Sequence, residues 1–259
     1  MADGSEPPLP PPFRAAGFDG ATERRIPLGA AALDAALGGG LAAGRLHEIF
    51  PRAREDAVAG IGFAAMLAAR LPGEVFWLRE RGSRSGVLYP PGLAEIGLDP
   101  GRLILATLPD PAALLRATAE AARCAGLGVV VAAIRGNPRI LDLAATRRLA
   151  LAAERTGATV LLLRPEAREI PSAARTRWGV AAAPSAPLDD TEAPGFPSLA
   201  LELLRRRGGP PAGPWMMEWD RAEKCLRPLG AGRDGGAALP GAVLPAAAER
   251  PDPPERRIA

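Results

Sequence analysis

The chain of 259 residues contains a single histidine, His47, a single lysine, Lys224, and two cysteines, Cys124 and Cys225. One histidine and two cysteines about a hundred residues apart cannot supply the usual ligand set of a structural zinc site. A phosphate-binding loop ending in Gly-Lys-Ser/Thr is excluded, because Lys224 follows Glu223 and lies far from any glycine-rich turn. We therefore expect neither a metal ion nor a cofactor.

Long apolar runs are also missing, and none reaches the length of a membrane span, so no membrane partner is expected. The sequence shows no secretory signal, which together with its two cysteines predicts a reducing, cytoplasmic setting. We expect Cys124 and Cys225 to be ordinary buried thiols and His47 to be a hydrogen-bonded residue inside a strand. The 32 basic residues nearly balance the 29 acidic ones, so the net charge of +3 does not demand a nucleic-acid or membrane-surface role.

Both ends of the chain are rich in proline and glycine. Residues 1–24 include Pro-Pro-Leu-Pro-Pro-Pro and predict a disordered N-terminal segment. Residues 230–259 include Gly-Arg-Asp-Gly-Gly and Pro-Asp-Pro-Pro and predict a disordered tail. Between these ends we expect a core at 25–170 and a C-terminal strand extension at 171–229.

Apolar strands alternate with helices through the expected core. The predicted strands are residues 44–50, 74–78, 103–107, 127–134 and 159–163, and the predicted helices are residues 57–70, 111–124 and 139–155. Uninterrupted apolar strands separated by helices are typical of a parallel sheet covered on both faces. The short strands expected after about residue 165, separated by Pro- and Gly-rich loops, predict an antiparallel extension of that sheet. The predicted fold is therefore an α/β three-layer sandwich.

Residues 33–50 carry the most specific motif, Leu-Asp-Ala-Ala-Leu-Gly-Gly-Gly-Leu-Ala-Ala-Gly-Arg-Leu-His-Glu-Ile-Phe. This pattern resembles the start of a RecA-type core, in which a short helix leads through glycines into the first strand. The glycines allow positive φ and a sharp turn before the strand. The resemblance implies a RecA-like fold for this chain.

The phosphate loop that should follow is replaced by Pro-Arg-Ala-Arg-Glu-Asp at residues 51–56. This loop has no glycine to bare backbone N–H groups, no lysine for phosphate and no hydroxyl for magnesium. The strand at 129–134 likewise lacks the metal-binding aspartate, and Glu80, which stands where the family carries its water-activating glutamate, cannot organise phosphoryl transfer alone. We therefore expect no enzymatic activity. An unusual RecA-like ATPase that binds single-stranded DNA and uses Arg52 or Arg54 in place of lysine remains the alternative.

The DNA-contacting loops of RecA-type proteins leave the sheet after the fourth and fifth strands, and both are short here. The second loop region carries four arginines that are candidates for weak contact with phosphate or single-stranded DNA. The alternative is an ordinary solvated arginine-rich surface. These candidates are Arg164, Arg168, Arg175 and Arg177.

Residues 199–220 include Leu-Glu-Leu-Leu-Arg-Arg-Arg-Gly-Gly and Trp-Met-Met-Glu-Trp-Asp. Together with the RecA-like start and the lost nucleotide motifs, this segment resembles the ImuA family, which is encoded beside ImuB and an error-prone polymerase III alpha-type subunit in bacterial mutagenesis cassettes. The resemblance implies a non-catalytic adaptor in damage-inducible SOS mutagenesis and translesion DNA synthesis, with ImuB, the polymerase or RecA as partners. A division inhibitor of the related SulA type, which binds FtsZ, is a further alternative.

Arginine, tryptophan and methionine, which are enriched in interface cores, gather near the end of this segment. Alternation along residues 215–219 also suits a core strand, with Trp215, Met217 and Trp219 on one face. A core strand and a partner surface therefore both remain open. The candidate partner residues are Arg205, Arg206, Arg207, Trp215, Met216 and Trp219.

Overall fold

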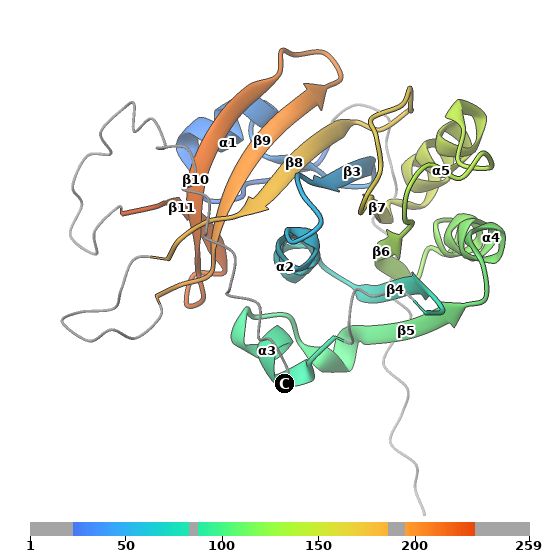
Figure 1. The fold of residues 1–259 in the computed structure, drawn as a ribbon, viewed down its shortest axis with the longest axis horizontal. Helices are drawn as coiled ribbons and strands as arrows, with labels where there is room; N and C mark the ends of the chain where they lie inside the picture. Colours follow the sequence, from blue (N-terminus) through green and yellow to red (C-terminus); the bar gives the residue numbers. More distant parts are fainter. Residues whose placement is uncertain (1–22, 83–87, 186–194, 231–259) are drawn as a thin grey trace, which may run out of the picture. The chain divides into compact units, whose positions relative to one another are not determined.

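The apolar strands of the chain assemble into one mixed sheet in the computed structural model, which describes residues 23–82, 88–185 and 195–230. The strand order is β11-β10-β9-β8-β3-β7-β6-β4-β5 (Figure 1). The strands are β3 (Leu46–Pro51), β4 (Glu74–Glu80), β5 (Leu103–Leu108), β6 (Leu127–Ala133), β7 (Thr159–Leu163), β8 (Thr176–Ala182), β9 (Ser198–Arg206), β10 (Ala212–Asp220) and β11 (Cys225–Pro228). Two short strands, β1 (Arg25–Ile26) and β2 (Leu41–Ala42), form a separate antiparallel pair.

Helices cover both faces of the sheet, as Figure 1 shows for α2 on one side and α4 and α5 on the other. The helices are α1 (Ala31–Leu37), α2 (Ala57–Arg70), α3 (Pro90–Glu95), the single 3-10 turn η1 (Pro100–Arg102), α4 (Pro111–Ala121) and α5 (Leu143–Thr156). Successive strand side chains point to opposite faces, so Ile49 joins the core beneath α2 and Leu46 joins the core beneath α4 and α5. The predicted α/β three-layer sandwich is confirmed.

The glycine-rich turn before the central strand adopts the backbone that its sequence requires. Gly38, Gly39 and Gly40 have φ of 77°, 106° and 119°, a region that residues with a side chain rarely enter. Asp34 holds the preceding chain in place, because its carboxylate accepts the N–H groups of Leu28 at 2.6 Å and Gly29 at 3.0 Å. The motif at residues 33–50 therefore forms a hydrogen-bonded, glycine-containing turn that connects α1 to β3.

The antiparallel part of the sheet begins one strand later than the sequence predicts. β8 pairs in parallel with β3, and only β9, β10 and β11 run antiparallel to their neighbours. β7 and β8 lie on opposite sides of β3, so residues 164–175 make a crossover rather than a hairpin. A crossover of about a dozen residues is long enough for this purpose, but it carries no helical periodicity that would reveal it.

Aspartates cap the N-termini of α4 and α5, the two helices that cover the face of the sheet opposite α2. Asp110 accepts the N–H of Ala113 at 2.7 Å at the start of α4, and Asp142 accepts the N–H of Ala145 at 2.7 Å at the start of α5. The cap at Asp142 explains why α5 begins four residues after the predicted residue 139. Gly157, with φ of 82°, ends α5 as the sequence predicts.

The described residues up to Leu229 form one unit. The segments 1–22 and 231–259, which contain most of the two predicted disordered ends, lie outside the described residues. In the part of the chain that is described, none of the helices has the length and apolar character needed to cross a membrane.

His47 is fully buried in β3, and both of its ring nitrogens are hydrogen-bonded as predicted. Its Nε2–H donates to the carbonyl of Ala42 at 2.8 Å, and its Nδ1 accepts from the hydroxyl of Thr176 at 2.7 Å. The same hydroxyl oxygen accepts the indole N–H of Trp178 at 2.9 Å. The expectation for Cys124 is wrong, because this thiol is exposed in the turn after α4; Cys225 is partly buried.

Burial lowers the pKa of His47 from its ordinary value of 6.5 to about 4. The unfolded chain therefore binds a proton that the folded chain rejects, so stability is present above pH 6.5 and is lost as pH falls toward 4, by roughly 3 kcal/mol in total. Urea unfolding between pH 7 and 5 should show this slope. The variant His47→Gln should show a flatter profile in the same window, and an unchanged slope would contradict the assignment.

Candidate functional site

The loop between β3 and α2 occupies the place of the phosphate loop, and several of its backbone N–H groups are already hydrogen-bonded. The carboxylate of Asp56 accepts the N–H of Ala53 at 3.0 Å through Oδ2 and the N–H of Ala182 in β8 at 2.9 Å through Oδ1. The N–H of Arg52 donates to the carbonyl of Val180 at 2.9 Å. An internal anion therefore holds the loop that would otherwise cradle a phosphate.

Charged side chains from three further strand ends gather near this loop. Arg135, after β6, forms an ion pair of 2.6 Å with Glu166, after β7, and the distance from Arg54 to Glu166 is 4.0 Å. The hydrogen bond and charge of Glu166, with a smaller effect of Glu80, raise the pKa of Arg135. This edge of parallel strands is the usual ligand position in open α/β sheets. Here it holds a partly exposed network of opposite charges.

The two loops that would carry DNA contacts are fastened to each other. The side chain of Asn137 donates to the carbonyl of Arg168 at 2.9 Å and accepts the N–H of Arg168 at 2.7 Å. The N–H of Gly136 donates to the carbonyl of Pro165 at 2.9 Å. These bonds hold the loops after β6 and β7 against each other.

Two of the four candidate phosphate contacts are buried around one carboxylate. Glu48, in β3, has no exposed side-chain surface and accepts from Arg164 at 3.2 Å, from Arg177 at 2.8 Å and from the hydroxyl of Ser172 at 2.7 Å. Arg164 also donates to the carbonyl of Gly136 at 3.0 Å. The guanidinium groups of Arg164 and Arg177 are thus committed to the core of the protein.

The other two arginines lie nearer the surface. Arg175 is about a quarter exposed and forms an ion pair of 2.8 Å with Glu23. Arg168 is exposed at the turn that Asn137 fastens. The structure does not bring the four arginines together as one surface, and Arg168 is the candidate that presents its side chain most openly to solvent.

The three arginines of the terminal segment have separate environments. Arg206 donates to the carbonyl of Ala36 at 2.7 Å and so caps the last turn of α1. Arg205 is exposed, and its guanidinium donates to the carbonyl of Ser172 at 3.2 Å. Arg207 is exposed and directly follows β9. Arg205 and Arg207 therefore remain surface candidates, whereas Arg206 has a structural contact.

The aromatic part of this segment is mostly core. Trp219 is 1% exposed, and its indole N–H donates to the carbonyl of Ile96 at 3.1 Å. Met217 is buried in the same cluster, and Trp215 packs against it while remaining half-buried. Met216 is half-buried on the opposite face of β10. The predicted alternation is confirmed, and the burial of Trp219 removes it from the accessible surface.

No group of three or more histidine, cysteine or carboxylate side chains is arranged to hold a metal ion among the residues that the structure describes.

Comparison with known proteins decides the family. The ImuA proteins of two strains of Caulobacter vibrioides are 34% identical to this chain over 201 residues, which cover 71% of the chain and 79% of the relative. The chain belongs to the ImuA family. No family model matches the chain.

The RecA-like architecture of this ImuA-family chain is supported by a solved structure. The crystal structure of the RadB recombinase superimposes with a TM-score of 0.52 at 17% identity, over 78% of this chain and 98% of RadB. At this identity the likeness establishes the fold alone. The predicted RecA-like α/β fold and the family resemblance are both confirmed.

One surface feature of this ImuA-family chain, a groove between α4 and α5, was not predicted from its sequence. Its floor is apolar and arginines stand around it. The spacing of Arg116 from Arg123 and of Arg148 from Arg155, seven residues in each case, was the available signal. Arg148 and Arg155 therefore lie on the same face of α5, about two turns apart, and Arg123 lies in the turn that follows α4.

Proposed function

We propose that this chain is a non-catalytic adaptor of the ImuA/ImuB mutagenesis system and acts in damage-inducible translesion DNA synthesis. Its proposed partners are an ImuB-like protein, the error-prone polymerase and RecA, in the cytoplasm. Membership of the ImuA family supports the system, and the RecA-like fold supports a role beside recombination proteins.

The observation that carries the non-catalytic part of the proposal is the position of Asp56. A triphosphate in the usual place would meet this carboxylate, whose oxygens already take the N–H groups of Ala53 and Ala182. Two unit negative charges about 4 Å apart repel each other by about 4 kcal/mol at an effective dielectric constant of about 20. Arg52 and Arg54 do not offset this repulsion, because each faces a carboxylate, Glu202 at 3.5 Å and Glu166 at 4.0 Å.

A tagged pull-down from DNA-damaged cells tests the adaptor role. We expect an ImuB-like protein, the error-prone polymerase or RecA to co-purify, and to be identified by mass spectrometry. An untagged strain treated with the same damaging agent is the control. Recovery of FtsZ without these proteins would replace the proposal with a SulA-type function, and recovery of no specific protein would count against an adaptor.

Titration calorimetry with magnesium and ATP tests the absence of nucleotide chemistry. We expect no saturable heat up to about 1 mM ATP, which corresponds to binding weaker than about −4 kcal/mol. The thermal midpoint should also stay constant when ATP is added, since a ligand that binds the folded state would raise it. Saturable binding with ATP turnover that Glu80→Gln abolishes would instead establish the ATPase alternative.

A further inference from the structure

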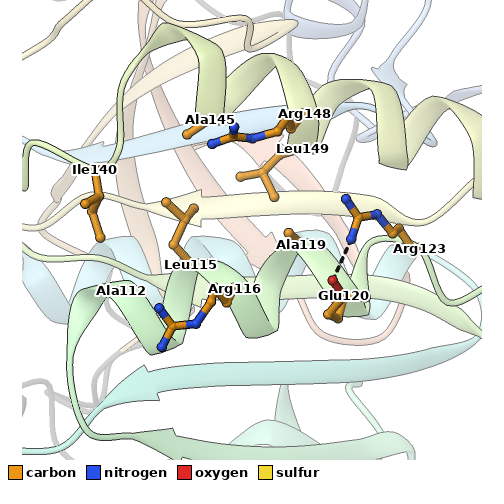
Figure 2. Close-up of a pocket in the computed structure, with 10 residues that line it drawn as sticks. All are labelled: Ala112, Leu115, Arg116, Ala119, Glu120, Arg123, Ile140, Ala145, Arg148 and Leu149. Atoms are coloured by element: carbon orange, nitrogen blue, oxygen red, sulfur yellow. Dashed lines mark hydrogen bonds and ion pairs between the residues drawn. The ribbon is translucent and has the colours of Figure 1, made fainter.

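Helices α4 and α5 lie side by side on one face of the sheet and leave a groove of about 620 Å³ between them. Figure 2 shows Leu115 from α4 and Ile140 and Leu149 from the α5 side pointing toward one another across it. Leu149 is buried, whereas Ile140 is 42% exposed beside it. The groove therefore offers an apolar floor that is open to solvent.

A second hollow of about 350 Å³ continues from the first, because both are lined by Arg123 and Arg148. The second hollow adds Leu151, which is 54% exposed, and Arg155. The two hollows together make one channel along the helices, of the size that protein pockets for ligands usually have.

Arginines dominate the rim of this channel. Four of them line it, Arg116, Arg123, Arg148 and Arg155, against the single carboxylate of Glu120. Glu120 pairs with Arg123 at 2.5 Å, as the dashed line in Figure 2 marks. Within the described part of the chain, no carboxylate lies in ion-pair range of the other three. The rim thus has an excess of positive charge.

We propose that the α4–α5 groove binds an acidic amphipathic segment of a partner protein. Apolar side chains of the segment would pack on Leu115, Ile140 and Leu149, as helices do when they bind in grooves. Aspartate or glutamate side chains flanking the apolar stripe would pair with Arg116 and Arg148, whose planar guanidinium groups suit carboxylates.

The apolar floor favours a protein segment over a nucleic acid. Interfaces with nucleic acids are polar and strongly positive throughout, and most of their contacts go to phosphates. A phosphate backbone on this surface would leave Ile140 and Leu115 without an apolar partner. An acidic amphipathic segment would cover these two side chains and also form ion pairs with the arginines.

This inference deepens the proposed function, since an adaptor needs surfaces for its partners, and it rests on that function only for the existence of a partner. Peptide binding is measured with the purified full chain, and the pull-down is made from cells, so each result can fail without the other.

Fluorescence anisotropy with a labelled acidic amphipathic peptide of about 18 residues tests the proposal. The peptide carries leucine at every third or fourth position and glutamate on the flanks, and a scrambled peptide has the same composition. We expect saturable binding of the amphipathic peptide only. Arg148→Glu should weaken it at least tenfold, while Arg147→Glu, the neighbouring exposed residue outside the groove lining, should change it less than twofold.

An apolar pair of variants tests the floor in the same way. Ile140→Ser should weaken peptide binding several-fold, and Leu143→Ser, an exposed residue of α5 outside the groove lining, should leave it unchanged. Equal effects of Arg147→Glu and Arg148→Glu, or equal binding of the scrambled peptide, would overturn the proposal. A single-stranded oligonucleotide that binds in an Arg148-dependent way and displaces the peptide would assign the groove to nucleic acid instead.

Discussion

Replacing Glu48 by glutamine is expected to lower the free energy of unfolding by about 3–5 kcal/mol, the cost of breaking a buried ion pair from one side. The glutamine would occupy a site with no solvent exposure, where the carboxylate now accepts hydrogen bonds from Arg164, Arg177 and Ser172. The buried guanidinium of Arg164 would then lack its counter-charge, and that of Arg177 would keep only Glu169, 3.9 Å away. Urea unfolding followed by tryptophan fluorescence measures the loss.

A matched control is Glu202→Gln, the same chemical change in a strand of the same sheet. Glu202 is 41% exposed and lies 3.5 Å from Arg52, so its ion pair is screened by water and should contribute no more than about 1 kcal/mol. A loss as small for Glu48→Gln as for Glu202→Gln would mean that the buried network does not hold the strand ends together.

The same network limits how DNA-binding experiments on the arginines can be interpreted. Replacement of Arg164 or Arg177 would remove one of the two guanidinium partners of the buried Glu48 and destabilise the fold, whatever the residue does with DNA. Arg168 is exposed and its guanidinium takes no part in the Glu48 network, so Arg168→Ala is the variant that reports on phosphate contact with little effect on stability.

The three-layer arrangement could be predicted because apolar periodicity reports burial directly. Residues 127–134 and 159–163 are uninterrupted apolar runs, and both became central strands covered by helices. The glycines at 38–40 were equally informative, since the turn into β3 requires positive φ at each of them.

Contacts between distant residues could not be predicted in the same way. Arg164 lies in a loop with other arginines, and nothing local indicates that its partner is Glu48, 116 residues earlier in the chain. The parallel pairing of β8 was missed for a similar reason, because its crossover is irregular and contains two prolines, Pro165 and Pro171. The groove between α4 and α5 depends on how far apart two helices pack, which the pattern of either helix alone does not contain.

Alternation along β10 predicted which side chains share a face but not how deeply each is buried. Trp215, Met217 and Trp219 do share one face, yet Trp219 is 1% exposed and Trp215 is half-buried. The difference arises along the strand, because Trp219 reaches the segment after α3, where its indole N–H meets the carbonyl of Ile96. The alternation of a strand therefore predicts which face a side chain lies on, but not how deeply the side chain is buried at its position along the strand.

Trp219→Ala is therefore expected to destabilise the protein by about 3–5 kcal/mol, the usual cost of emptying a buried aromatic site. The carbonyl of Ile96 would also lose its hydrogen-bond donor. Trp215→Ala, on the same face of the same strand, should cost clearly less, because Trp215 is only half-buried. Equilibrium unfolding of both variants in urea measures the difference.

A third variant keeps this test decisive if Trp219→Ala does not fold. Trp219→Phe retains most of the apolar volume but removes the indole donor, so it should lose about 1–3 kcal/mol, between the wild type and the alanine variant. A fully folded Trp219→Ala protein that had lost only partner binding would contradict the core assignment and return Trp219 to the partner surface. The expected order of stability, with Trp215→Ala above Trp219→Ala, would leave Arg205, Arg207 and the half-buried Met216 and Trp215 as the part of this segment that a partner can reach.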